Sequence, residues 1–323
     1  DPMTLPLLSV GAVGAIGVVG VLSAFLPSLV LAISAMFVFG FGVSITDVAM
    51  NIEGAGVERE LERTIMQWFH ALFSAGTAVG GGLAALASAA GLGVEYHFAI
   101  ASGLLIGPTI WSVRLMGGVE ARTRGNREEK TSGGLRERVA VWAEGRTVLI
   151  GLVAMSMAFA EGSANDWLAL AMVDDRGYTN AQGALWFVLF TGAMTLGRVL
   201  GVPLIDRFGR VPILFASASA ALAGLSVVIL VDNLVIAAIA VVAWGLGSSL
   251  GFPVAMSAAA DDPKRGPARV SAVATIAYGA FLIGPPLIGG LAELSSILTA
   301  LWVVAAVIAM GLLATPATKK PEA

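Results

Sequence analysis

Four ionisable side chains lie inside long apolar stretches of the sequence: Asp47, Glu161, Asp166 and Arg198. A charge at the centre of a membrane helix costs roughly 2.5–3.5 kcal/mol, so it usually faces a polar cavity or an oppositely charged partner. These residues are therefore the first candidates for binding a proton or a polar solute.

Glu161 and Arg198 form the most suggestive pair. Glu161 lies near the middle of its apolar stretch, and Arg198 lies two helical turns before Asp206, roughly 12 Å inside its own stretch. A carboxylate that alternates between an arginine and an apolar setting can take up and release a proton. We interpret Glu161 as a proton or substrate site with Arg198 as its partner. The alternative is a static ion pair that only joins two helices.

Two further positions could contribute to such a site. Asp47 and Asn51 lie one turn apart on one helix face, where they could bracket a hydroxylated ligand. The alternative for Asp47 is a solvated helix end. An unperturbed imidazole titrates near neutral pH, so His70 could pass a proton, although a lone histidine is also a common hydrogen-bonded structural residue.

Asp166 and Trp167 combine a carboxylate with an aromatic ring. This combination suits stacking of a sugar face on the indole. The alternative is an interfacial anchor, because tryptophan is enriched at the membrane surface.

Other chemistry is not indicated by the residue types. The sequence has no Cys and only 2 His, and it contains neither a phosphate-binding Gly-rich loop with Lys nor a Ser/His/acid set. We therefore predict that the chain is not an enzyme and holds no metal or cofactor. A formal net charge of -3 argues against a nucleic-acid partner, since phosphate binding needs concentrated Lys and Arg.

The elements that position these residues are predicted to be membrane helices. Hydrophobic residues make up 57% of the 323 residues and charged residues 13%, against about 25% charged in a soluble domain. The apolar residues arrive in blocks of about 20, enough to cross a ~30 Å hydrocarbon core. We predict an all-α, polytopic membrane protein embedded in the lipid bilayer. Its ten candidate spans are 5–26, 28–50, 66–90, 98–115, 147–172, 183–205, 211–231, 234–256, 268–291 and 295–315.

The basic residues predict the orientation of these spans. All of the 19 Lys and Arg residues except Arg176 and Arg198 fall on one side, in or at the edge of alternate loops. Basic loops stay in the cytoplasm, so both termini are expected there, in an inner or plasma membrane. The expected domains are a four-helix N-terminal bundle (1–115), a cytoplasmic central loop (116–146), a six-helix C-terminal bundle (147–315) and a cytoplasmic tail (316–323).

The two bundles carry an internal repeat. Gly40-Phe41-Gly42 followed by Val48-Ala49-Met50 matches Gly245-Leu246-Gly247 followed by Val254-Ala255-Met256, and further matches keep nearly the same displacement. Duplicated halves of this kind indicate parallel repeats about an axis along the membrane normal. Spans 147–172 and 183–205 have no counterpart in the first half. We therefore expect ten of twelve helices, with the first two missing from this N-terminally truncated sequence.

One loop carries a resemblance to a known family. Leu204-Ile205-Asp206-Arg207-Phe208-Gly209-Arg210 resembles the signature loop of the major facilitator superfamily, Gly-x-Leu-x-Asp-Arg-x-Gly-Arg-Arg. Val202 and Val211 depart from that pattern. The resemblance implies a two-bundle transporter fold in which Asp206, Arg207, Gly209 and Arg210 form a cytoplasmic gating loop.

Within that superfamily the first half resembles the fucose-permease group of sugar–proton symporters. The resemblance rests on Asp47-Val48-Ala49-Met50-Asn51 and on Gln67-Trp68-Phe69-His70, where His70 replaces the group's Asn. It implies that Asp47, Asn51 and His70 belong to a solute or proton site. The group's other coupling acid lies in a helix that this sequence lacks.

The expected function is secondary active transport of a small solute, a sugar or another small polar molecule, coupled to protons. The first alternative is a drug or metabolite efflux carrier of the same fold. The second is a membrane sensor, or a defective remnant, that transports nothing.

Overall fold

A computed structural model of the chain describes most of its second half and parts of its first half. The described residues are 30, 33–34, 37–38, 40–42, 66–93, 96–101, 103–104, 107–108, 111, 139–262 and 265–320. The chain divides into two compact units, Asp1–Met66 with Ala87–Ser132 and Gln67–Leu86 with Gly133–Ala323. The second unit contains most of the described residues.

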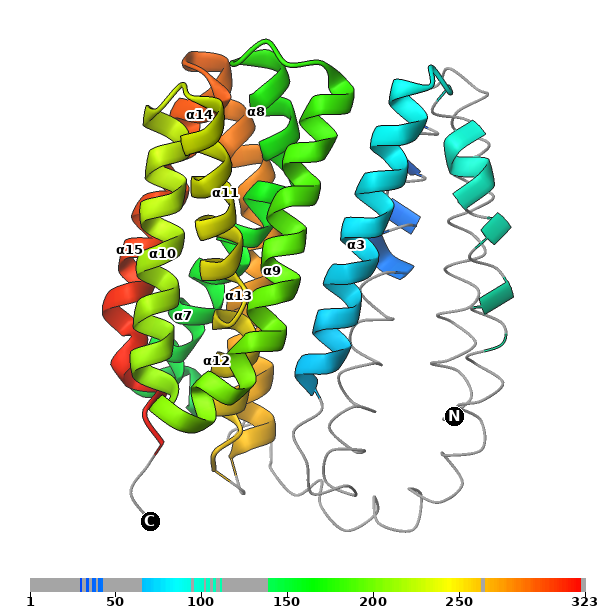
Figure 1. Ribbon diagram of the computed structural model, residues 1–323. Coiled ribbons are helices and arrows are strands. Elements are labelled where there is room, and N and C mark those ends of the chain that lie inside the picture. The colour runs from blue at the N-terminus through cyan, green and yellow to red at the C-terminus, as the bar shows by residue number, and fades with distance from the viewer. Residues whose placement is uncertain are drawn as a thin grey trace. The chain divides into compact units, whose positions relative to one another are not determined.

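Every regular element in the described ranges is a helix (Figure 1). The bounds are α3 Met66–Ala89, η2 Val141–Ala143, α7 Gly145–Ser163, η3 Ala164–Leu168, α8 Ala169–Asp174, α9 Asn180–Phe208, α10 Arg210–Leu230, α11 Leu234–Ser248, α12 Gly251–Ala259, α13 Gly266–Leu294, α14 Ile297–Ala300, α15 Trp302–Ala314 and η4 Thr315–Thr318. In this part of the chain, 7 helices are long and apolar enough to cross a membrane.

These seven helices coincide with seven of the predicted spans. The first is Trp68–Ala89, and the other six follow one another from Gly145 to Thr318. The predicted helical fold class is therefore confirmed for this part of the chain. The expected span 5–26 lies outside the described residues. The expected spans 28–50 and 98–115 are described only in part, and the central loop is described only from residue 139.

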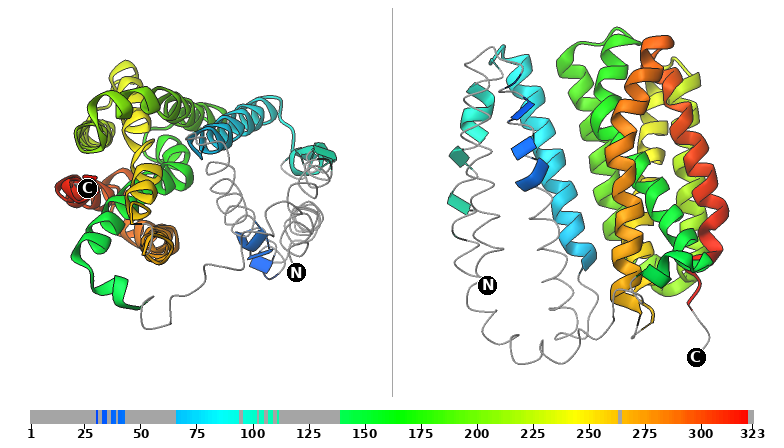
Figure 2. Two further views of the ribbon diagram at one scale, coloured as in Figure 1. Left: turned by 90° about the horizontal axis from the view of Figure 1, so that it is seen from below. Right: turned by 180° about the vertical axis from the view of Figure 1, so that it is seen from behind.

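Helix α7 lies at the centre of the second unit, against α12, α13 and α15, while α10 packs on α11 and α9 (Figure 2). The interior is filled by large side chains such as Phe190 and Trp244. Their rings pack edge to face, with 5.1 Å between the ring centroids. Glycine allows the close approaches. A Cβ on Gly224 would meet backbone atoms of Trp244, so α10 and α11 touch main chain to main chain.

The outer surface of this unit is apolar. Leu282 is 78% exposed and Leu313 is 80% exposed, and many other large apolar side chains are also uncovered. Exposing such a side chain to water forgoes about 1.5–3 kcal/mol. A surface of this kind is suited to lipid acyl chains, in agreement with the predicted membrane location.

Two irregularities interrupt the helices near the middle of the unit. The span from Gly145 to Asp174 contains the π-helical turn η3, and the span from Leu234 to Ala259 breaks between Ser248 and Gly251. π turns and broken membrane helices are frequently found at functional sites, because they free or redirect polar groups. Both irregularities contribute to the site described below.

Candidate functional site

Arg198 makes polar contacts with three other segments of the second unit. It projects from α9, and its side chain is only 4% exposed. A guanidinium group has five N–H donors and no acceptor, so burial requires several acceptors around it. Those acceptors come from α3, α7 and the break between α11 and α12.

Glu161 on α7 supplies the counter-charge. Arg198 Nη2 lies 3.1 Å from Glu161 Oε2 and 3.3 Å from Oε1, so one nitrogen donates to both carboxylate oxygens. The Glu161 side chain is 16% exposed. The structure thus brings together the two residues that the sequence suggested as partners.

The break between α11 and α12 supplies a backbone acceptor. In a continuous helix the carbonyl of Ser249 would accept from the N–H of residue 253, but Pro253 has none. Arg198 Nε donates to the freed Ser249 carbonyl at 3.3 Å. Gly197 permits this approach, because a Cβ there would overlap the Ser249 side chain.

The remaining acceptors lie on the part of α3 that belongs to the second unit. Arg198 Nη1 donates to the backbone carbonyl of His70 at 3.2 Å and to the hydroxyl of Ser74. The His70 imidazole and the Phe252 ring pack edge to face, with 6.3 Å between their centroids. Arg198 therefore joins three other helical segments to its own.

Asp166 and Trp167 lie in η3, one turn beyond Glu161. Both line a small pocket between the α7–η3 segment and α13, with room for about one water molecule. The six-membered ring of Trp167 faces Gly289 on α13. Asp47 and Asn51 lie outside the described residues, so their places relative to this site stay predictions.

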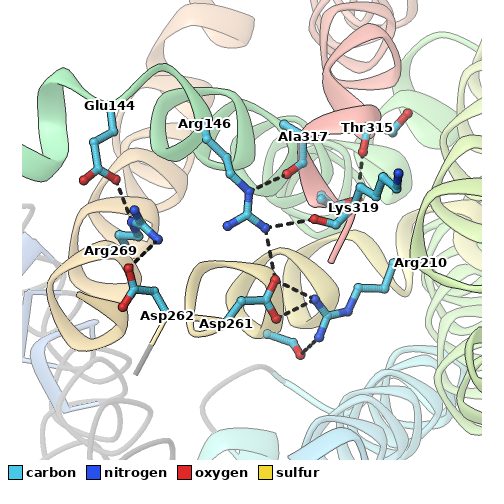
Figure 3. A network of polar contacts seen from close by, with 11 residues as sticks. Glu144, Arg146, Arg210, Asp261, Asp262, Arg269, Thr315, Ala317 and Lys319 are labelled. Atoms are coloured by element: carbon cyan, nitrogen blue, oxygen red, sulfur yellow. Dashed lines mark hydrogen bonds and ion pairs between the residues drawn. The ribbon is translucent and has the colours of Figure 1, made fainter. Parts of the chain in front are cut away.

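The predicted gating loop lies at the turn between α9 and α10. Gly209 has a positive φ of 82°, which glycine adopts without strain. Asp206 and Arg207 are exposed, and the Arg207 guanidinium lies 5.2 Å from the ring centroid of Phe208. Arg210 turns inward and binds Asp261 at 2.8 and 3.0 Å (Figure 3).

Asp261 is shared by two arginines at this end of the bundle. Its side chain is only 7% exposed, and Arg146 Nη2 lies 3.0 Å from Oδ2. Arg146 also donates to the carbonyls of Ala317 and Lys319, each at 3.1 Å (Figure 3). The network therefore joins the starts of α7 and α10, the end of α12 and the residues after α15.

Glu144 forms the second part of this network, just before α7. Its carboxylate binds Arg269 at 2.6 Å and Arg265 at 2.8 Å. The hydrogen bond from Arg269 is the main reason why the pKa of Glu144 is lowered, with Thr147 and Arg265 adding to the effect and partial burial opposing it. Glu144 is thus held as a carboxylate.

Several residues of these sites were not among the predicted ones. Ser74 and Ser249 carry no charge, and Asp261 and Glu144 lie in a loop and at a helix start, where acidic residues are common. The one usable signal was Pro253, which implies a free carbonyl four residues earlier. Ser163, which lines the pocket beside Asp166 and Trp167, was also missed.

Comparison with known proteins agrees with this architecture. The sequence profile of the major facilitator superfamily matches residues 57–279 and 150–323. An uncharacterized MFS-type transporter of Yersinia pestis is 33% identical over 274 residues, 84% of this chain and 68% of the relative. The uncharacterized transporter y4wD of Sinorhizobium fredii is 30% identical over 301 residues, covering 91% and 76%. The chain belongs to the major facilitator superfamily.

The solved structures show the same fold. A single-residue variant of the fucose:proton symporter FucP of Escherichia coli aligns over 99% of this chain and 84% of its own, with a TM-score of 0.72 and 14% sequence identity. A bacterial homolog of the human lysosomal transporter Spinster aligns over 97% and 83%, with a TM-score of 0.54 and 15% identity. The family and fold are those of multi-pass membrane proteins that carry out secondary transport of small molecules.

Proposed function

We propose that this protein carries a small polar solute across the cell membrane together with a proton, and that Glu161 is the group that binds the proton. The observation that carries this proposal is the buried Glu161–Arg198 pair in the interior of the second unit. An acid inside a membrane bundle with a partner that has other acceptors can change charge without unfolding its surroundings.

The contacts of Arg198 favour an ion pair that can separate over a static one. Protonating Glu161 removes the counter-charge, and a buried cation left alone is costly. Arg198 keeps three further acceptors, namely the carbonyls of Ser249 and His70 and the hydroxyl of Ser74. These groups lower the cost of the protonated state. A solute oxygen that approaches Arg198 would lower it further.

The proposed solute is a sugar or another small polar molecule. FucP, a fucose:proton symporter, shares the fold, and Asp166 and Trp167 offer a carboxylate and an aromatic ring close to Glu161 along α7 and η3. Asp47, Asn51 and His70 remain proposed contributors from the first half. We also propose that both termini lie in the cytoplasm, because the basic loops fall on that side.

The gating loop is part of the same proposal. In carriers built from repeats, alternating access moves one bundle against the other around a fixed site. Asp206 and Arg207 are exposed at the end of the bundle, where they can reach a moving neighbour, while Arg210 is held by Asp261. We therefore assign the first two to the gate and Arg210 to its support.

Proton movement tests the role of Glu161. Proteoliposomes loaded with a pH-sensitive dye receive an inward gradient of L-fucose, D-galactose or D-glucose. We expect the wild type to move protons with a sugar and Glu161→Gln to lose this movement. The matched control is Glu293→Gln, which changes an exposed carboxyl near the end of α13 and should behave like the wild type. Unchanged proton movement in Glu161→Gln would contradict the proposal.

A further inference from the structure

The charge network at the end of the bundle where α7 and α13 begin has more cations than anions. Within the described residues its ion pairs join four arginines to three carboxylates, namely Arg146, Arg210, Arg265 and Arg269 to Glu144, Asp261 and Asp262. One positive charge of this network therefore has no counter-charge within it. An anion from outside the protein can balance that charge.

Arg265 is the arginine of this network that is best placed to bind such an anion. Its side chain is 50% exposed, whereas that of Arg269 is 15% exposed and binds both Glu144 and Asp262 (Figure 3). Among the described residues the Arg265 side chain donates to Glu144 alone, from Nη1 at 2.8 Å. The N–H groups of its Nε and Nη2 thus remain for an outside acceptor.

An exposed tryptophan lies close to this arginine. Trp142 in η2 is 45% exposed and Val139, just before η2, is 60% exposed, while Val141 is 1% exposed and fixes η2 to the bundle. The η2 turn packs against α13. Glu144, two residues after Trp142, is the residue that Arg265 binds. A cation with open donors and an exposed apolar surface therefore lie at the same place on the bundle.

Both side chains start near the depth of the lipid headgroups. Trp142 and Arg265 each stand three residues before a membrane-length segment, Gly145–Asp174 and Ala268–Leu294. These segments have 30 and 27 residues, so at 1.5 Å per residue they are about 45 and 40 Å long, close to the ~40–45 Å of a bilayer with its headgroups. Their first residues lie at headgroup level, which the long side chains of tryptophan and arginine can reach.

The combination of groups favours an anionic phospholipid over other ligands. A phosphate oxygen pair accepts two parallel hydrogen bonds from a guanidinium fork, and an indole ring is most stable at the boundary between headgroups and acyl chains. A cationic ligand would be repelled by the unbalanced positive charge. Free inorganic phosphate would bind Arg265 but leave the apolar surface of Trp142 and Val139 uncovered.

We propose that Arg265 and Trp142 form a binding site for the headgroup of an anionic phospholipid, such as phosphatidylglycerol, in the adjacent leaflet. The lipid phosphate binds the open side of the Arg265 guanidinium and balances the charge of the network. Because Arg265 is bound to Glu144, the lipid is attached to the starts of both α7 and α13. The inference is independent of the transported solute and of proton binding by Glu161.

Lipid-induced stabilisation of the purified protein in a non-ionic detergent tests this site, because a ligand that binds the folded state raises Tm. The probes are phosphatidylglycerol, phosphatidylcholine and inorganic phosphate. We expect phosphatidylglycerol to raise Tm at a lower mole fraction than phosphatidylcholine, and inorganic phosphate to have little effect. Arg265→Gln should raise the phosphatidylglycerol mole fraction at half-maximal stabilisation by about 10-fold, the loss of a charge-assisted hydrogen bond. Trp142→Ala should weaken the binding of both lipids.

The variants separate lipid binding from general loss of stability. Arg265→Gln also removes the bond to Glu144, so each lipid titration is measured against the same variant without lipid. Trp142→Ala leaves every ion pair of the network in place. The matched control is Arg207→Gln, at another exposed arginine of this end of the bundle, which should keep the preference for phosphatidylglycerol.

Three results would overturn the inference. The first is equal stabilisation of the wild type by the two phospholipids. The second is an equal loss of phosphatidylglycerol binding in Arg207→Gln and Arg265→Gln, which would show a diffuse attraction to surface charge. The third is full stabilisation by inorganic phosphate alone, which would show an anion site that takes no lipid.

Discussion

At the scale of single residues, Arg198 binds more separate segments of the chain than any other charged side chain in the described residues. It is almost fully buried, and its acceptors lie on three other segments of the chain. Lysine cannot replace it, because an ammonium is a point charge and lacks the planar fork that reaches several acceptors at once. Glu161 is different, because within the described residues its carboxylate accepts hydrogen bonds from Arg198 alone.

Removing one partner of this pair should cost more than removing both. Arg198→Ala leaves Glu161 without its cation, and we expect a loss of stability of about 3 kcal/mol or more. The double variant Arg198→Ala/Glu161→Ala should recover part of that loss. Thermal or denaturant unfolding in detergent measures both. Arg207→Ala, at an exposed position, is the control and should change stability by no more than ~0.5 kcal/mol.

At the scale of elements, the irregular turns, rather than the regular helices, place several polar groups of the site. Pro253 frees the Ser249 carbonyl for Arg198, and η3 turns Asp166 and Trp167 toward α13. The regular parts provide close packing, in which glycine positions decide how near two helices come. The site is therefore built at helix breaks, and the packing of the regular helices fixes the positions of these breaks.

The coupling between Pro253 and Arg198 can be measured. Pro253→Ala restores an N–H that can bond the Ser249 carbonyl, so the arginine loses exclusive use of that acceptor. In a double-mutant cycle with Arg198→Lys, we expect an interaction energy of about 1 kcal/mol in unfolding measurements. Pro203→Ala changes another proline, at an exposed position of α9, and should combine additively with Arg198→Lys. Additivity of Pro253→Ala would show that the carbonyl does not hold the arginine.

Two glycines of α13 provide a matched test of packing. Gly284 faces the Phe159 ring of α7, whereas a Cβ on Gly279 would meet no atom within 4 Å. Gly284→Ala should therefore destabilise the protein by about 1–3 kcal/mol through overpacking. Gly279→Ala should be neutral or stabilising by up to ~1 kcal/mol, because alanine is the better helix former. Equal Tm values for the two variants would argue against the close α7–α13 contact.

At the scale of the whole molecule, the described bundle is joined at one end by a charge network and apolar over its surface. The network gathers residues from five places in the sequence, from Glu144 to Lys319 (Figure 3). Asp261 and Glu144 each hold two arginines, so the helix ends are joined at two carboxylates. In the proposed transport cycle, helix ends joined in this way would let the bundle move as one body.

The lowered pKa of Glu144 gives this network a pH dependence. Because its pKa is lower in the folded protein than in the unfolded chain, its stabilising contribution is complete above the ordinary value of 4.5. That contribution is lost as the pH falls through the lowered pKa. We expect Glu144→Gln to reduce Tm at pH 7 and to differ less and less from the wild type as the pH drops below 4.5. A constant Tm difference across this range would contradict the assignment.

Seven of the membrane helices, the interior charges and the family could be inferred from the amino-acid sequence alone. Apolar blocks of about 20 residues are typical of membrane helices, and a charge inside such a helix usually has a partner, so the sequence alone indicated Glu161 and Arg198. The signature loop from Leu204 to Arg210 predicted the superfamily, which the comparisons confirmed.

The partners of these charges could be identified only in the folded structure. The acceptors around Arg198 include the carbonyls of Ser249 and His70, and backbone carbonyls look alike at every position of a sequence. The pocket at η3 depends on where α13 crosses α7, which two glycine–phenylalanine contacts determine. Hydropathy decides that a helix enters the bilayer, whereas the helix faces that meet depend on side-chain shape across segments far apart in the chain.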